Sequence, residues 1–199
     1  MSIFRVMRVA AGLSLLVFAG VRSGLFQSCN VPVVMANNPL TSIVSSGNEV
    51  IHYAPSENLE SIDLQQLADA KGHLDIAMYA FTDRSIAQEL VRLADLGIAI
   101  RIYRDGEQFQ QEEERGNSTA DILRGHANIH IKVKRPSRQA LMHLKAYTDG
   151  TVLREGSANW SLAGLRVQDN DLTLTTKNVE AFERLFDELW LRPSNLEVQ

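Results

Sequence analysis

The sequence is poor in cysteine, with Cys29 alone among 199 residues. One thiol cannot form an internal disulfide or a cysteine-based zinc site. Cys29 follows Phe26-Gln27-Ser28, which resembles a lipoprotein acylation box only loosely, so we interpret it as a spare residue of a discarded leader rather than a lipid anchor. The remaining chain would then tolerate an oxidising compartment without depending on a disulfide.

Acidic residues are absent from the first 48 positions, where Arg5 and Arg8 precede an apolar run over residues 9–20. Basic residues followed by a short apolar run are typical of an export signal. The run is shorter than the ~20 residues that span a bilayer as a helix, which favours a cleaved signal over a membrane anchor. Cleavage after Ala19 or after Ala36 would satisfy the preference for small residues.

We therefore expect residues 1–36 to be a signal peptide or, if uncleaved, an N-terminal membrane anchor. The protein is expected to be exported, in the periplasm or secreted, and to contact the inner membrane only if that segment is retained. Residues 37–48 are rich in Asn and Ser and predict a linker. With no internal repeat and too few residues for two ordinary domains, residues 49–192 should form one domain, followed by a tail over 193–199.

A second stretch without acidic residues lies between Asp121 and Asp149 and contains six basic ones. The whole chain has a formal net charge of −4, and loss of residues 1–36 would make it −7, because three arginines and no acidic residue are removed. A basic strip on an acidic body suits the binding of an anionic substrate, the alternative being a solvated basic loop. The expected substrate-binding residues are Lys132, Lys134, Arg135 and Arg138.

Apolar runs of strand type and of helix type alternate along the domain. This alternation predicts an α/β fold in which a mixed sheet is sandwiched between helices. Residues 105–117, rich in Glu and Gln, predict an exposed loop with some helix and no functional role, and Tyr79 is expected in the core. Strands are expected at residues 50–53, 74–81, 98–103, 129–133, 143–148, 151–155 and 171–176, and helices at 59–71, 85–96, 119–124 and 179–191.

The segment over residues 143–159 gathers side chains that suit a phosphoryl site. Side chains of a strand alternate between its faces, so His143 and Lys145 should project to the same side. An Asp-Gly turn at residues 149–150 predicts a hairpin, which brings Ser157 and Asn159 back beside the first strand. A nucleophile or base, a cation, a hydroxyl and an amide are the groups needed to hold and attack a phosphoryl group.

These residues resemble the His-x-Lys, Asp, Gly-Ser-x-Asn signature of the phospholipase D superfamily. Three residues separate Lys145 from Asp149, one fewer than is usual in that family, where the Asp acts structurally more than chemically. The flanks at 53–55, 77–82 and 168–171 resemble those of small single-motif bacterial endonucleases of the superfamily, and the similarity spans residues 50–191. The resemblance implies a phospholipase D/nuclease-like single domain that hydrolyses phosphodiester bonds without a cofactor.

The resemblance further implies a metal-independent reaction in which His143 attacks phosphorus and water resolves the phosphohistidine. A carboxylate would orient the imidazole, with Asp169 as the candidate and Asp171 as the alternative. A second histidine must protonate the leaving oxygen. Because the chain has one motif, that group should be His143 of the partner subunit in a homodimer. The expected catalytic residues are His143, Lys145, Asp149, Ser157, Asn159 and Asp169.

Several alternatives stay open at this point. The favoured function is a low-specificity endonuclease acting on DNA or RNA, because no base-reading element is visible. A lipid phosphodiesterase or phosphatidyltransferase and a catalytically silent nucleic-acid-binding module are the alternatives. A triad of Ser157, His143 and Asp149 would lack the Gly-x-Ser-x-Gly turn of acyl hydrolases. His126 and His130 have the spacing of metal ligands on a helix, but they lie at a predicted strand and are expected to be structural.

Overall fold

The computed structural model describes residues 49–198, so the predicted leader and linker lie outside the described residues. The strands of this part form one sheet in the order β1-β7-β6-β5-β2-β3-β4-β8. The pairs β2–β3 and β3–β4 are parallel, and every other pairing between named strands is antiparallel. The strands are β1 (Glu49–Ala54), β2 (His73–Met78), β3 (Ala99–Asp105), β4 (Ile129–Lys134), β5 (Lys145–Thr148), β6 (Leu153–Gly156), β7 (Asn170–Thr175) and β8 (Leu196–Val198).

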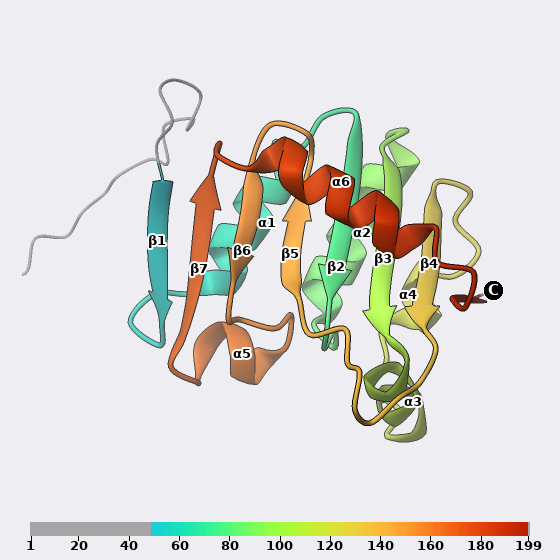
Figure 1. Ribbon diagram of the computed structural model, residues 1–199. Coiled ribbons are helices and arrows are strands. Elements are labelled where there is room, and N and C mark those ends of the chain that lie inside the picture. Colours follow the sequence, from blue (N-terminus) through green and yellow to red (C-terminus); the bar gives the residue numbers. More distant parts are fainter. Residues whose placement is uncertain (1–48, 199) are drawn as a thin grey trace, which may run out of the picture. The chain divides into compact units, whose positions relative to one another are not determined.

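Helices cover both faces of the sheet, which confirms the predicted α/β sandwich (Figure 1). One face carries α1 (Leu59–Ala68), α2 (Arg84–Asp95) and α4 (Ala120–Leu123), while α6 (Val179–Trp190) crosses the other face. The short α5 (Leu162–Arg166) and α3 (Gly106–Glu114) lie near the edge at which β6 and β3 end. The α6 helix passes over β5, β2, β3 and β4 and leaves the face of β1, β7 and β6 without a helix.

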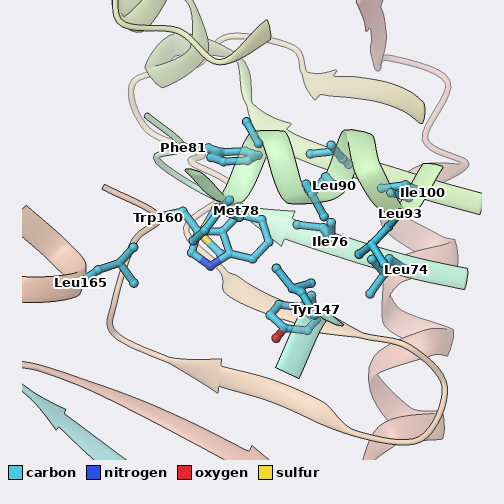
Figure 2. Close-up of a cluster of buried hydrophobic side chains, with 14 of the residues drawn as sticks. Leu74, Ile76, Met78, Phe81, Leu90, Leu93, Ile100, Tyr147, Trp160 and Leu165 are labelled. Carbon is cyan, nitrogen blue, oxygen red and sulfur yellow. The ribbon is translucent and has the colours of Figure 1, made fainter. Parts of the chain in front are cut away.

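The larger core lies between the sheet and α2. The Asp83 carboxylate caps α2 by accepting from the Ile86 amide, and the helix then buries residues at helical spacing. Alternate residues of β2 point toward that helix, so Leu74, Ile76 and Met78 are fully buried beside Leu90 and Leu93 (Figure 2). The indole of Trp160 packs edge-on against Phe81 and extends this core toward the end of β2.

Several segments differ from their sequence-based expectation, among them α5, which no predicted element covered, and the strand expected from residue 143, which begins at Lys145. The second strand ends at Met78 rather than residue 81, because the amides of Ala80 and Phe81 donate to side chains instead of a neighbouring strand. Residues 106–114 form α3, which buries Glu112 and is not merely an exposed charged loop. The segment over 193–199, expected to be a tail, contains β8, which pairs with β4 and extends the sheet.

A buried ion pair joins α1 to the antiparallel half of the sheet. The side chains of Asp63 and Arg154 are fully buried and form a two-pronged contact, at 3.0 Å from Nε and 2.9 Å from Nη2. Trp160 Nε1 also donates to Asp63 at 2.9 Å. The remaining guanidinium nitrogen of Arg154 donates to the backbone carbonyls of Lys145 and Ala158. The Arg154 side chain therefore fixes the backbone at Lys145 and at Ala158, in the two segments that carry the signature.

Removing one partner of this pair should destabilise the fold strongly, because it leaves the other charge buried without compensation. We expect Asp63→Ala to lower the free energy of unfolding by about 3–5 kcal/mol, measured by urea denaturation. The matched control is Arg184→Gln, which breaks an exposed pair with Glu180 and should cost less than about 1 kcal/mol. Equal effects of the two substitutions would contradict this account of the buried pair.

Candidate active site

The signature residues meet at one edge of the sheet. The parallel strands β2, β3 and β4 end there, and because β5 and β6 run antiparallel, β5 begins and β6 ends at the same edge. His143 lies two residues before β5, and Lys145 is its first residue. Ser157 and Asn159 follow the end of β6. The topology therefore gathers the imidazole, ammonium, hydroxyl and amide of a segment whose ends, His143 and Asn159, are 16 positions apart in the sequence.

His143 and Lys145 are in direct contact, although His143 lies outside the strand. The ammonium Nζ lies 3.0 Å from Nδ1 and 3.2 Å from Nε2 of the imidazole, and it donates to the His143 carbonyl at 2.7 Å. An ammonium can donate to an imidazole only when the ring is neutral at that nitrogen. Burial and the charge of Lys145 lower the pKa of His143, against an opposing effect of Asp105. The contact thus favours the neutral, nucleophilic form.

Lys145 is itself buried, with 7% of its surface exposed. Burial and, after it, the charge of Arg154 lower the pKa of this lysine to about 8. An ammonium in this environment lacks much of its hydration, which strengthens its attraction to a phosphate oxygen. Lys145 is therefore suited to hold a nonbridging oxygen beside the imidazole.

Asn159 and Ser157 are held by their neighbours in defined orientations. The Asn159 Oδ1 atom accepts from the Ala80 amide at 3.1 Å, which leaves its Nδ2 group without a hydrogen-bond partner among residues 49–198. Ser157 donates from both its amide and its hydroxyl to Asp171, and its Oγ accepts from the Asp171 amide. The Asn159 amide can thus donate to a phosphate oxygen, whereas Asp171 positions Ser157.

Neither of the two other predicted catalytic aspartates hydrogen-bonds to the imidazole. Asp149 follows the opposite end of β5, where its Oδ1 accepts from Thr151 and Val152 and closes the turn to β6, so its role is structural. Asp169 is exposed just before β7. Within the described part of the chain, no carboxylate hydrogen-bonds to the His143 ring, so an orienting role for Asp169 stays a prediction.

Sequence reasoning missed two residues beside His143. Asp105 accepts from the Met142 amide at 2.8 Å and caps α3 through the Gln108 amide, which fixes the chain directly before the histidine. Tyr79, expected in the core, is only half-buried, and its ring centroid lies 4.5 Å from that of the imidazole. The sequence signal for Asp105 was an acidic residue at the end of an apolar strand and the start of a helix.

The basic strip is only partly free. Lys132 contacts Glu197 and the ring of Trp190, and Lys134 donates to the Leu141 carbonyl. Arg138 is 90% exposed and lies 3.4 Å from Glu107, while Arg135 is exposed. Lys134, Arg135 and Arg138 belong to the end of β4 and the loop that leads to His143. This loop therefore carries positive charge in the segment of the chain that directly precedes the imidazole, with Arg138 beside the acidic Glu107 of α3.

A family model for a phospholipase D-like domain of the cardiolipin synthase type matches residues 64–190, which include every signature residue. The chain belongs to the phospholipase D superfamily. It is similar to proteins named mitochondrial cardiolipin hydrolase, at 29% identity over 130 residues in Chlamydomonas reinhardtii and 27% over 130 in Xenopus laevis. Each match covers 64% of this chain and, respectively, 55% and 59% of the relative, so the chain spans little more than half of their length.

Two solved structures of the superfamily share the fold over their whole length. The structure of NucT from Helicobacter pylori aligns with a TM-score of 0.67 and 20% identity, covering 77% of this chain and 100% of that one. The structure of Nuc, a phospholipase D family member from Salmonella typhimurium, aligns with a TM-score of 0.66 and 19% identity, covering 77% and 99%. The nucleases and cardiolipin hydrolases of the superfamily are phosphodiester hydrolases, and the side chains gathered at the site agree with that chemistry.

Residues 49–198 offer neither a metal-binding cluster nor a membrane-spanning helix. No cluster of three or more His, Cys, Asp or Glu side chains among them is arranged to hold a metal ion. His126 lies 3.7 Å from Asp95, and His130 is an exposed residue of β4, so the two histidines do not form a site together. No helix in this part of the chain is long and apolar enough to cross a membrane.

Anion binding at this site should weaken above about pH 8, because Lys145 loses its proton as the pH rises through its lowered pKa. We expect the Kd for dimethyl phosphate, whose charge is constant in this range, to rise toward tenfold per pH unit well above that value. Binding is followed by the NMR signals of His143 between pH 7 and 9.5. Lys145→Met should bind weakly at every pH, and the exposed control Lys71→Gln should behave as the wild type. A pH-independent Kd in the wild type would exclude Lys145 as the anion ligand.

Proposed function

We propose that the protein is a metal-independent phosphodiesterase that works through a phosphohistidine. The observation that supports this most directly is the contact between His143 and Lys145, flanked by the oriented amide of Asn159. A neutral imidazole nitrogen can attack phosphorus, while the ammonium and the amide stabilise the negative charge on the nonbridging oxygens. These side chains supply the charge stabilisation that a metal ion supplies in other phosphodiesterases.

The reaction then takes two balanced steps. A ring nitrogen of His143 forms a bond to phosphorus as the bond from phosphorus to the leaving oxygen breaks, and a general acid protonates that oxygen. Water next attacks the phosphohistidine and gives a proton to the group that acted as the general acid. The bond from phosphorus to the ring nitrogen breaks in this step, which frees the imidazole. Ser157, held by Asp171, assists in binding the phosphoryl oxygens.

The general acid is the least obvious member of this scheme, because the imidazole of one subunit cannot be neutral and protonated at once. Within residues 49–198, the remaining histidines lie elsewhere: His52 beside Glu57, His73 near Glu183, and His126 and His130 far along the sheet. We therefore propose a homodimer in which His143 of the partner subunit completes the site. The face of β1, β7 and β6 that no helix covers borders the site and offers a surface for that subunit.

Nucleic acid is the substrate class that we favour. The loop that leads to His143 carries the exposed Arg135 and Arg138 and follows the partly exposed Lys134, and a polyanion would gain from each of these charges. No element suited to reading bases is evident, so we propose low sequence specificity on DNA or RNA. Export, directed by the predicted leader over residues 1–36, remains part of this proposal.

Phospholipid is the second candidate, and it has its own support. The matching family model is described as the phospholipase D-like domain of cardiolipin synthase, and the curated relatives are named cardiolipin hydrolases. Leu141 and Leu144, which flank His143, are 42% and 37% exposed. Apolar side chains around an anion site are suited to contact acyl chains while the head group enters.

A substrate panel in excess EDTA separates these candidates. We expect cleavage of plasmid DNA or RNA, because nothing in the proposed chemistry requires a metal. His143→Ala should lower the rate at least about a thousandfold, whereas the exposed control His130→Ala should retain it. Release of phosphatidate from cardiolipin or phosphatidylcholine vesicles, without nuclease activity, would favour the second candidate. Activity lost in EDTA and restored by Mg²⁺ or Zn²⁺ would overturn the phosphohistidine scheme.

The composite site makes a separate prediction about mixed dimers. A dimer of one wild-type chain and one His143→Ala chain holds a single imidazole and should be nearly inactive, because attack and leaving-group protonation need one each. Subunits carrying different affinity tags are exchanged, and the purified mixed dimers are assayed on the panel substrate. Half of the wild-type activity in demonstrated mixed dimers would mean that each subunit acts alone.

A further inference from the structure

Tyr79 lies against both catalytic side chains of the signature. Its ring centroid is 4.5 Å from that of the His143 imidazole, with the planes tilted by 54°. The Lys145 ammonium lies 5.0 Å from the centroid of the same phenol ring. The three side chains thus contact one another, with Nζ of Lys145 also within 3.0 Å of Nδ1 of His143.

The backbone of Tyr79 is fixed from both sides. Its amide donates to the carbonyl of Leu144, the residue between His143 and Lys145, at 2.9 Å. Its carbonyl accepts from Arg104, whose guanidinium is paired with Glu112 in a fully buried contact of 2.7 Å. Glu112 in turn accepts from the amide of Phe81, two residues further on. The phenol ring therefore stands on a rigid support rather than on a free loop.

No carboxylate in residues 49–198 hydrogen-bonds to the His143 ring, so the orienting role expected of Asp169 stays a prediction. Besides contacting Lys145, the imidazole packs against the phenol ring of Tyr79. On the basis of the proposed phosphodiesterase function, we propose that Tyr79 is a positioning residue, whose ring holds the His143 imidazole for attack and keeps the Lys145 ammonium beside it. The ring, not the hydroxyl, carries this role.

The physical basis is the charge distribution of the aromatic ring. The face of a phenol ring is electron-rich and attracts an ammonium within about 6 Å, which favours the charged form of Lys145 against the burial that opposes it. The tilted contact with the imidazole removes rotational freedom from a side chain that is otherwise exposed. Burial and the charges of Asp105, Glu107 and Glu112 raise the pKa of Tyr79, so the phenol stays neutral.

The test compares Tyr79→Phe, which keeps the ring, with Tyr79→Leu, which keeps apolar bulk alone. The probe is bis(p-nitrophenyl) phosphate, whose leaving group departs without a proton, so the rate reports attack by His143. We expect Tyr79→Phe to stay within about twofold of wild-type kcat and Tyr79→Leu to lose about tenfold to a hundredfold. The alkaline limb of the pH profile of Tyr79→Leu should move down by about half a unit, because Lys145 loses its aromatic partner.

A second readout needs no activity and separates this inference from the proposed function. NMR titration of the full chain gives the ring-current shift of the His143 Hε1 signal and the pKa of Lys145. Tyr79→Leu should remove that shift and lower the pKa of Lys145, while Tyr79→Phe and the exposed control Tyr53→Leu should change neither. An unchanged shift and pKa in Tyr79→Leu would overturn the inference, as would equal losses in the Phe and Leu variants. If the wild type cleaves no phosphodiester but Tyr79→Leu still changes the shift and the pKa, only the proposed function is overturned.

Discussion

The structure depends most on the buried contact between Asp63 and Arg154. Burying an arginine is unfavourable unless its donors are matched, and here Asp63 takes two of them while the carbonyls of Lys145 and Ala158 take the third nitrogen. Those carbonyls belong to the two ends of the signature, which come together only when β5 and β6 pair. The ion pair therefore sets the position of the lysine relative to the asparagine more directly than the hairpin itself does.

A second buried pair performs the same task on the other side of the site. Arg104 and Glu112 are both almost fully buried, and both also hydrogen-bond to the backbone of residues 78–81, while Glu112 accepts one further bond from the Gln108 side chain. This segment supplies the amide of Ala80 to Asn159 and the ring of Tyr79 to His143. Two structural ion pairs thus hold two backbone segments, and the reactive side chains extend from those segments. Preorganisation of this kind lets the site stabilise a developing charge without rearranging.

The sequence was sufficient for the architecture and for the residues of the signature, but not for what holds them. Alternating apolar runs identify strands and helices because each element buries a face with its own period, and the signature is contiguous enough to be read directly. Asp63, Glu112 and Tyr79 could not be assigned in this way, because each acts through a partner at least 31 positions away or through a contact that only the folded sheet creates. The charge of Arg154 within an apolar strand was a usable signal, since a buried arginine implies a buried acid. Residues 105–117 were expected to be an exposed loop with some helix, and the extent of α3 was underestimated because its composition is dominated by Glu and Gln, in which a single buried Glu112 is invisible.

The electrostatics of the site form a chain that runs from the core to the imidazole. Burial is the largest cause that lowers the pKa of both Lys145 and His143; after it, the charge of Arg154 lowers that of Lys145, and the charge of Lys145 lowers that of His143. The Asp63 carboxylate pairs with Arg154 at 2.9 Å, and its negative charge opposes that of the arginine behind Lys145. The imidazole that we propose as nucleophile is therefore neutral partly because the lysine beside it is charged. Attack needs a neutral His143, and anion binding needs a protonated Lys145. This series of charges maintains both states at pH values above the pKa of His143 and below that of Lys145.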